Sequence, residues 1–147
     1  MKKILVMNGP NLNMLGKREP ELYGSVSLAD IQVEMLKRAK NSDVELEFFQ
    51  SNHEGELIDR LHEAREKVDA VIINAGGLTH TSVSLHDALR VAAVPVIEVH
   101  MSNIYSREEF RQKSLIAPAA VGGIFGFGTM SYYLALDAAL ALLQDRE

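Results

Sequence analysis

Residues 4–24 read ILVMNGPNLNMLGKREPELYG, and this stretch decides how the chain is expected to fold. Its first four residues form a short apolar run that ends in Asn-Gly-Pro, which is typical of a buried strand followed by a turn. The connection that follows, residues 8–24, exceeds the roughly 2–6 residues that usually join a strand to a helix in α/β units. After the first strand of an open parallel sheet, such a loop lies where these folds bind ligands. We interpret it as a structured binding loop, because its bulky apolar side chains need burial: Leu12, Met14, Leu15 and Leu22.

Strands and helices are predicted to alternate along the rest of the chain. Short apolar or alternating runs indicate strands, and apolar residues three or four positions apart indicate helices. The expected strands cover residues 2–8, 44–50, 69–74, 94–99 and 121–127, and the expected helices 27–41, 51–68, 81–92, 107–113 and 131–144. This alternation demands parallel strands joined by right-handed crossovers. We therefore predict an α/β protein, a flavodoxin-like three-layer sandwich with a five-stranded parallel sheet in the order 2-1-3-4-5.

Length and composition limit the classes of protein. The 147 residues suit one domain, expected to span residues 1–147. A net charge of −5 with no basic run argues against nucleic-acid binding. The absence of cysteine excludes disulfides and thiolate catalysis. The apolar runs at residues 4–7 and 134–143 are too short for a signal peptide or a membrane span, so no membrane partner and a cytoplasmic location are expected.

Polar side chains follow several strands at the point where each strand ends. The carboxyl ends of parallel strands meet at one edge of the sheet, which is where ligands bind in such folds. The sequence therefore predicts that one rim gathers three histidines, three arginines, a tyrosine and three acids together with several polar neighbours: Asn11, Arg18, Tyr23, Asn52, His53, Glu54, Asn74, His80, Asp87, Glu98, His100, Ser102, Arg107 and Arg111.

Glu98 and His100 lie in the run VPVIEVH, two residues apart and hence on the same face of a strand. A carboxylate inside a buried strand costs several kcal/mol unless it is paired. A neighbouring carboxylate orients an imidazole and favours its protonated form, which prepares a general acid near neutral pH. The two residues are therefore read as an acid catalyst with its support, and a purely structural ion pair is the alternative.

Arg18 precedes Tyr23 in the loop after the first strand. A free tyrosine has a pKa of about 10 and is a poor base at neutral pH. A nearby guanidinium stabilises the phenolate, so this pair is a candidate general base. The alternative is a tyrosine that packs on the leucines of its loop.

Several familiar motifs are absent from the sequence. The first loop lacks both Gly-x-Gly-x-x-Gly and the Ser or Thr that a P-loop needs after its lysine. No His-x-x-x-His pair suits zinc, no serine lies in a nucleophile elbow, and no lysine ends an apolar strand. His62 and His86 are interpreted as solvated side chains.

At this point the chain resembles type II 3-dehydroquinate dehydratases over essentially its whole length. The resemblance rests on these blocks: Gly9–Pro20 with Tyr23-Gly24, Gln50–Ile58, Asn74, Thr79–Val83, Asp87–Leu89, Glu98–Asn103 and Arg107–Arg111. It implies a shikimate-pathway lyase that removes water from 3-dehydroquinate through an enolate, without metal, imine or other cofactor. It also implies a homododecamer built from trimers.

The resemblance assigns roles to residues of this chain. Tyr23 would take the C2 proton and Arg18 would keep it ionised, while Asn11 would hold the water or the enolate oxygen. His100 would protonate the departing C1 hydroxyl with support from Glu98. The residues expected to bind substrate are Asn74, His80, Asp87, Met101, Ser102 and Arg111.

The sequence departs from the pattern of that family at a few positions. Leu78, His86, Tyr105, Gln112 and Lys113 stand where other residues are usual. These departures are expected to affect substrate affinity or subunit contacts rather than the class of reaction, because none is a proposed proton-transfer residue.

Two readings from other classes stay open on the sequence alone. The first is a non-catalytic flavodoxin-like module that binds a small ligand. Phosphoryl acceptance is disfavoured for it, because Asn8 and Asn74 stand where receiver domains need acids. The second is an interaction subunit, since the last helix is apolar nearly all round. That helix is expected either to contact another subunit or to be covered by its own chain.

Overall fold

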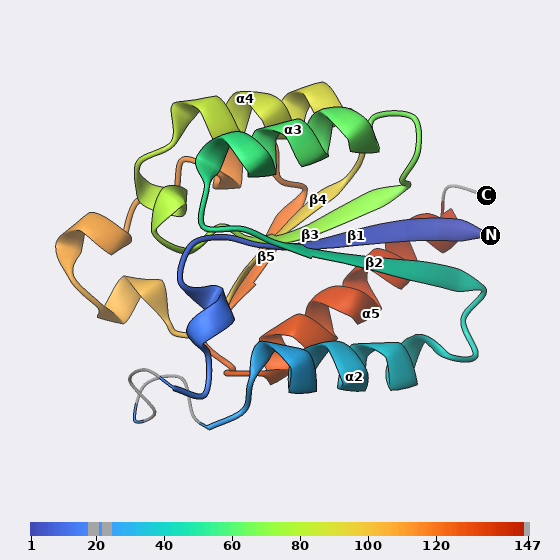
Figure 1. Cartoon of the computed structure of the whole chain (residues 1–147), viewed down its shortest axis with the longest axis horizontal. Coiled ribbons are helices and arrows are strands. Elements are labelled where there is room, and N and C mark those ends of the chain that lie inside the picture. The colour runs from blue at the N-terminus through green and yellow to red at the C-terminus, as the bar shows by residue number, and fades with distance from the viewer. Residues whose placement is uncertain (18–20, 22–24, 146–147) are drawn as a thin grey trace.

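The computed structural model of the chain describes residues 1–17, 21 and 25–145. Within these residues, five parallel strands form one sheet in the order β2-β1-β3-β4-β5, as the sequence predicts. Figure 1 shows helices covering both faces of the sheet, α3 and α4 on one face and α2 and α5 on the other. The strands are β1 (Lys2–Asn8), β2 (Val44–Gln50), β3 (Ala70–Asn74), β4 (Val96–His100) and β5 (Gly122–Phe125). The α-helices are α2 (Leu28–Ala39), α3 (Glu54–Ala64), α4 (Val83–Ala92) and α5 (Met130–Asp145).

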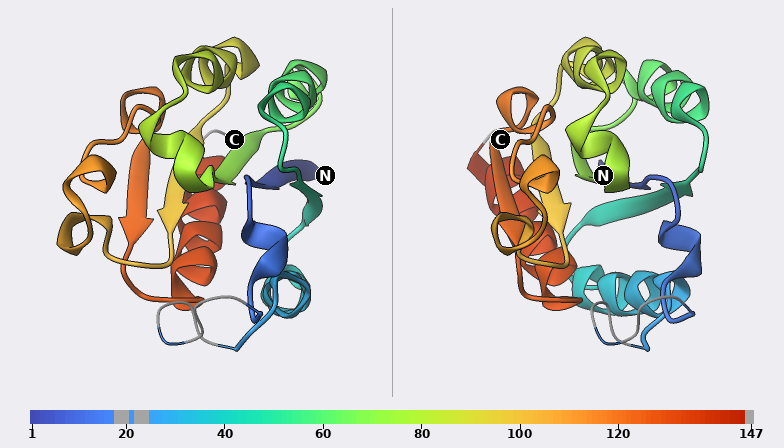
Figure 2. Two further views of the ribbon diagram at one scale, coloured as in Figure 1. Left: turned by 60° about the vertical axis from the view of Figure 1, so that its left-hand side comes forward. Right: turned by 90° about the vertical axis from the view of Figure 1, so that its left-hand side faces the viewer.

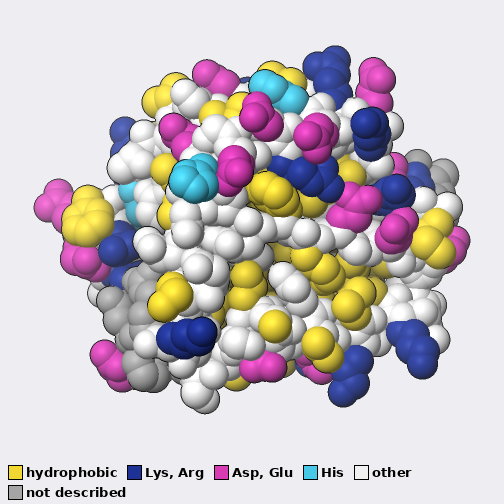
Figure 3. Space-filling view, viewed as in Figure 1, with side chains coloured by type: hydrophobic (Ala, Val, Ile, Leu, Met, Phe, Trp, Pro, Cys, Tyr) yellow, Lys and Arg dark blue, Asp and Glu magenta, His cyan; other side chains and the backbone are white. Residues whose placement is uncertain are grey.

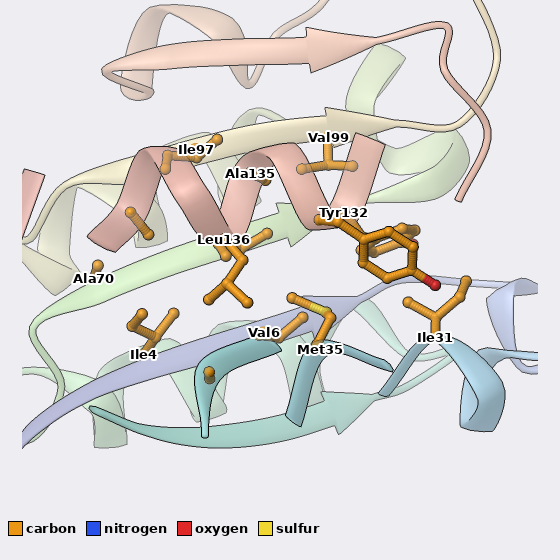
Figure 4. Close-up of a cluster of buried hydrophobic side chains, with 14 of the residues drawn as sticks. Ile4, Val6, Ile31, Met35, Ala70, Ile97, Val99, Tyr132, Ala135 and Leu136 are labelled. Atoms are coloured by element: carbon orange, nitrogen blue, oxygen red, sulfur yellow. The ribbon is translucent and has the colours of Figure 1, made fainter. Parts of the chain in front are cut away.

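Two buried clusters hold the layers together. On one face, apolar residues of β1, β3 and β4 pack against α2 and α5. Figure 4 shows this cluster, with the ring of Tyr132 from α5 lying beside Met35 and Ile31 of α2. On the other face, Leu5, Met7 and their neighbours pack against α3 and α4. Residues that alternate along one strand, such as Val6 and Met7, thus enter opposite clusters, which explains why the central strands are apolar throughout.

The edge strand β2 is protected by charge. Its alternating glutamates lie beside Lys3 of β1. The Nζ atom of Lys3 is 3.8 Å from the carboxylate of Glu45 and 3.5 Å from that of Glu47. Arg60 of α3 also donates to Glu47. Figure 3 shows acidic and basic side chains mixed over the face that carries this strand. Such pairing disfavours strand addition at an exposed edge.

Local signals set the helix ends. Ser27 accepts a hydrogen bond from the Asp30 N–H, and Asp30 accepts one from the Ser27 N–H, so this aspartate completes a reciprocal capping box. Ser82 caps α4 through the Leu85 N–H.

Two helix predictions are too long. The second helix ends at Ala64 rather than at residue 68, because Glu66 adopts a left-handed backbone with φ of 67°. Val68 is nevertheless buried, so its apolar spacing reflects the core and not a continuing helix. The predicted helix at 107–113 is a short 3₁₀ turn, η4 (Glu109–Arg111).

The loops after β1 and β3 approach each other closely at the carboxyl edge of the sheet. The Gly9 N–H donates to the Asn74 carbonyl at 2.8 Å. A Cβ on Gly9 would lie 2.5 Å from the Ala75 carbonyl oxygen, and one on Gly76 would lie 2.9 Å from the Pro10 oxygen. Two glycines thus let the two loops touch through their backbones. Figure 2 looks onto this edge, where the connections after β1, β3 and β4 gather.

The last helix is covered by its own chain on its inner face and retains apolar side chains on its outer face. Tyr132, Ala135, Leu136, Ala139 and Leu143 are buried in the first cluster, whereas Leu134 is exposed. The chain itself therefore covers the inner face of this helix, and contact of the outer face with another subunit stays a prediction. Among the described residues, no helix combines the length and the apolar character that crossing a membrane requires.

Candidate active site

A pocket opens at the carboxyl edge of the sheet, where the sequence places the polar residues. It is built by the segments after three adjacent strands, β1, β3 and β4. Eight of the predicted site residues line it: Asn11, Asn74, His80, His100, Met101, Ser102, Arg107 and Arg111. The fold thus brings together side chains that are up to 100 positions apart, from Asn11 to Arg111.

The centre of the site is a buried pair, His100 and Glu98. His100 Nε2 donates to Glu98 Oε2 at 2.6 Å, and the two side chains are only 9% and 8% exposed. A carboxylate can only accept, so the bond fixes the proton on Nε2. That arrangement leaves Nδ1 of His100 to face a bound molecule, and His100 is the member of the pair that lines the pocket.

The Glu98 carboxyl stays ionised despite its position. Burial acts to raise the pKa of Glu98, but hydrogen bonds from His100 and Ser114 and the charges of His100 and His80 outweigh it. The pKa of Glu98 is therefore lowered below its ordinary value. An ionised carboxylate stabilises the positive charge that an imidazolium carries as an acid.

A second histidine faces the first across the pocket. The rings of His80 and His100 are stacked, with centroids 6.4 Å apart. His80 Nδ1 donates to the Lys113 carbonyl at 2.9 Å, which holds its ring and leaves Nε2 for a ligand. Two imidazoles with fixed orientations can therefore both bind polar groups of one small molecule.

Two arginines supply positive charge to the same pocket. Arg107 donates to Ser102 Oγ at 3.2 Å, and Arg111 donates to Glu108 at 3.1 Å. Their side chains are 15% and 24% exposed, so both are partly shielded from water. Guanidinium groups in such positions suit a carboxylate ligand.

Asn74 is fixed by a buried chain of hydrogen bonds. Asn74 Nδ2 donates to the Tyr132 hydroxyl at 2.9 Å, and that hydroxyl donates to Asn8 Oδ1 at 2.6 Å. Asn74 Oδ1 accepts from the Gly76 N–H at 3.1 Å. Burial raises the pKa of Tyr132, so its hydroxyl remains protonated and serves as a fixed connector. Tyr132 was missed from the sequence, because only the packing of α5 brings it to Asn74.

The loop after β1 is held by a hydrogen bond to the segment after β2 and by two buried leucines. Asn11 adopts a left-handed backbone with φ of 73°, and its N–H donates to Asn52 Oδ1 at 2.9 Å. Leu12 and Leu15 are buried as predicted, but Met14 is exposed. Asn52 after β2 thus supports the loop and is not among the described residues that line the pocket.

Other predicted residues lie elsewhere. Asp87 is exposed on α4 and is not one of the described residues lining this pocket. Glu54, expected at the rim, accepts a hydrogen bond from Ser82 instead. Arg18, Leu22 and Tyr23 lie outside the described residues.

The interpretation of His86 as a solvated side chain is wrong. Its Nδ1 donates to the Leu115 carbonyl at 2.6 Å, and its Nε2 accepts from Arg90 at 2.9 Å. The contact with Leu115 could not be predicted from the sequence, because that residue lies 29 positions later, whereas Arg90 lies one helical turn after His86.

Comparisons with known proteins agree on one family. The family described as Dehydroquinase class II matches residues 2–140. The chain is 57% identical over 144 residues to a 3-dehydroquinate dehydratase of Caldicellulosiruptor bescii, which covers 97% of this chain and 99% of that relative.

Solved structures give the same result. A type II dehydroquinase from Butyrivibrio crossotus superimposes with a TM-score of 0.91 and 43% identity, covering 94% of this chain and 97% of that one. A type II dehydroquinase from Propionibacterium acnes gives a TM-score of 0.92 and 36% identity, covering 96% and 97%.

Proposed function

Because this chain belongs to the class II dehydroquinase family, it is a lyase that dehydrates 3-dehydroquinate, and we propose that its rim pocket is where the reaction occurs. The rim pocket is the one that Asn11, Asn74, His80, His100 and Arg111 line together with their neighbours. The product is 3-dehydroshikimate, and the step belongs to the shikimate pathway, which leads to chorismate and the aromatic amino acids.

The observation that carries this assignment is the buried His100–Glu98 pair, whose His100 lines the pocket. His100 in its imidazolium form donates the Nδ1 proton to the C1 hydroxyl of 3-dehydroquinate, which leaves as water. The ionised Glu98, held 2.6 Å from Nε2, supports this role because it stabilises the imidazolium before transfer and fixes the ring. The electron pair that expels the hydroxyl comes from the enolate and forms the C1–C2 double bond.

The enolate forms when a base removes the C2 proton. We assign this step to Tyr23 and assign Arg18 to keeping its phenolate ionised, on the family resemblance alone. Asn11 lines the pocket, and its side-chain amide can donate a hydrogen bond to the enolate oxygen or to a water. Preorganised donors matter at this point because the negative charge develops on the enolate oxygen. After turnover, Tyr23 carries a proton and His100 has lost one. Proton exchange with solvent returns Tyr23 and His100 to their starting protonation states.

Substrate binding is assigned to the remaining polar groups of the pocket. Arg111 is proposed to bind the substrate carboxylate, and Arg107 joins it because it lines the same pocket. Asn74, His80 and the backbone of Met101 and Ser102 are proposed to bind hydroxyl groups and the carboxylate. Asp87 remains a proposed substrate contact from the resemblance, although it is exposed on α4.

We propose that residues 1–147 act as one catalytic domain, in the cytoplasm, within a homododecamer of trimers and without metal, imine or nucleic-acid partner. The location rests on the short apolar runs of the sequence, the lack of a nucleic-acid partner rests on its charge, and the lack of metal and imine rests on the resemblance. Support for assembly comes from apolar side chains exposed near the β5 edge, with Val121 63% and Phe127 64% exposed. An apolar groove between β5 and α5 continues this surface. The mass of the purified protein by light scattering tests the assembly.

The reaction is tested by mixing purified protein with 3-dehydroquinate and following the ultraviolet absorbance of the conjugated enone product. Absorbance is expected to rise at the same rate with and without borohydride. Sensitivity to borohydride would mean that a lysine forms an imine with the substrate. No rise at all would contradict the proposed function.

A further inference from the structure

The carboxylate behind the catalytic histidine has a second partner that the roles above do not use. Ser114 donates from Oγ to Glu98 Oε2 at 2.7 Å. This is the same oxygen that accepts the His100 Nε2 proton at 2.6 Å. Ser114 is not among the described residues that line the rim pocket, so a direct contact with substrate is not its role.

The direction of the Ser114 hydroxyl is fixed by its own partners. Its oxygen accepts the N–H of Ile116 at 3.2 Å and the N–H of Ala117 at 3.0 Å. A hydroxyl has one proton and two acceptor lone pairs. Because both lone pairs are occupied, the proton has one direction left, towards Glu98. The bond is therefore preorganised and is not one of several equivalent rotamers.

The backbone that carries Ser114 is itself anchored to the elements beneath the pocket. The Leu115 N–H donates to the Thr79 carbonyl at 2.8 Å. The Leu115 carbonyl accepts from His86, and Arg90 joins His86 to the Pro118 carbonyl at 3.0 Å. Residues 113–118 are thus fastened to α4 and to the 3₁₀ turn η2 (Gly76–His80). These anchors fix the position from which Ser114 reaches Glu98.

We propose that Ser114 is a positioning residue for the dehydration, which holds the Glu98 carboxylate so that Oε2 aims the His100 ring at the substrate. The inference rests on the proposed function, since it deepens the role of the His100–Glu98 pair. Without the hydroxyl, the carboxylate can rotate about its terminal bond, and His100 loses its fixed orientation. In the wild-type chain, residues 113–118 thus support the acid catalyst His100 through Ser114 and Glu98.

The test compares kinetics of Ser114→Ala with wild-type enzyme across pH. A hydrogen bond to a charged group is worth enough to change a rate by roughly ten-fold or more. We expect kcat of the alanine variant to fall about ten-fold while KM changes little, and Ser114→Thr to restore most of kcat because it keeps the hydroxyl. Ser106→Ala is the matched control, because the Ser106 hydroxyl donates only to the nearby Asn103 carbonyl among its described bonds.

A pH profile separates positioning from a merely structural role. The Ser114 bond lowers the pKa of Glu98, and His100 and His80 are the charged groups that face this carboxyl. Removing the bond raises that pKa, so the acid limb of kcat is expected to move to higher pH in Ser114→Ala. If Ser114 served only to accept the N–H groups of Ile116 and Ala117, its loss would lower the melting temperature without moving the acid limb of kcat.

The outcomes distinguish the two proposals. A wild-type protein that does not dehydrate 3-dehydroquinate would overturn the proposed function. In that case, carbon-13 titration of the Glu98 carboxyl still tests Ser114, and an unchanged midpoint in Ser114→Ala overturns the positioning role. An active wild type with unchanged kcat and acid limb in Ser114→Ala also overturns it. If the alanine variant does not fold, Ser114→Cys, a weaker donor, must show the same loss, and wild-type kcat in that variant is the contradicting result.

Discussion

A buried ionised carboxylate is costly, and Glu98 is tolerated because two donors converge on one of its oxygens. The pair His100–Glu98 therefore combines stability with chemistry. Glu98 is needed as an anion for catalysis, and the same bonds that keep it ionised make folding depend on pH. The effect of Glu98 on catalysis and its effect on the pH dependence of folding can be measured separately.

The first prediction concerns acid stability. The pKa of Glu98 in the folded protein lies below its ordinary value of 4.5, so the unfolded state binds the proton first on acidification. The stability that Glu98 contributes is present above pH 4.5 and is lost as pH falls through the folded pKa. Urea unfolding of wild type and Glu98→Gln should therefore show a difference in free energy of unfolding that narrows on acidification. A difference that stays constant from neutral to acid pH would contradict this account.

The second prediction concerns the buried connector Tyr132. Tyr132→Phe leaves Asn74 Nδ2 and Asn8 Oδ1 without their hydroxyl partner, and an unpaired buried group costs about 1–3 kcal/mol. Asn74 then loses its fixed orientation in the pocket, so KM should rise several-fold with a smaller effect on kcat.

Steady-state kinetics and thermal unfolding measure both effects. Tyr133→Phe on the same helix is the control, since the Tyr133 hydroxyl bonds Thr129 rather than Asn74. An unchanged KM in Tyr132→Phe would show that the chain of hydrogen bonds does not orient Asn74.

At the scale of elements, the site depends on how closely the loops after β1 and β3 approach. Gly9→Ala would place a Cβ 2.5 Å from the Ala75 oxygen, so one of the loops must move. Overpacking of this kind typically costs about 1–3 kcal/mol, and the displaced Asn11 and Asn74 should reduce kcat/KM strongly.

The matched control for this change is Gly55→Ala. Gly55 lies in α3, and an added Cβ there meets nothing within 4 Å. Alanine is a better helix former, so the control should be as stable as wild type or more stable. Equal melting temperatures and activities for Gly9→Ala and wild type would refute the close approach of the loops.

The alternation of strand-like and helix-like runs was enough to predict a parallel sheet with helices on both faces, and a central run such as Ala70–Asn74 is buried throughout. The end of α3 was not predictable, because Val68 keeps the helical spacing although the backbone turns at Glu66. Capping at Ser27 and Ser82 was predictable, since it depends on residues only three positions away. Local signals therefore fix where elements begin better than where they end.

At the scale of the molecule, the rim was predictable because parallel strands end at one edge. His100 and Glu98 followed from their spacing of two in a strand. Ser114 and Tyr132 did not, because their partners are 16 and 58 positions away and depend on how loops and helices pack. Arg18 and Tyr23 remain predictions of the sequence, as they lie outside the described residues.

Turnover of 3-dehydroquinate by His100→Ala, measured beside wild type together with product binding by calorimetry, tests whether the buried pair is the catalytic centre. General acid catalysis contributes roughly 10²–10⁴-fold. The variant is expected to fold and to bind product within a few-fold of wild type, while kcat falls by about 10²-fold or more. Turnover by His100→Ala close to that of wild type would contradict the assignment of the rim pocket and its buried pair as the catalytic centre.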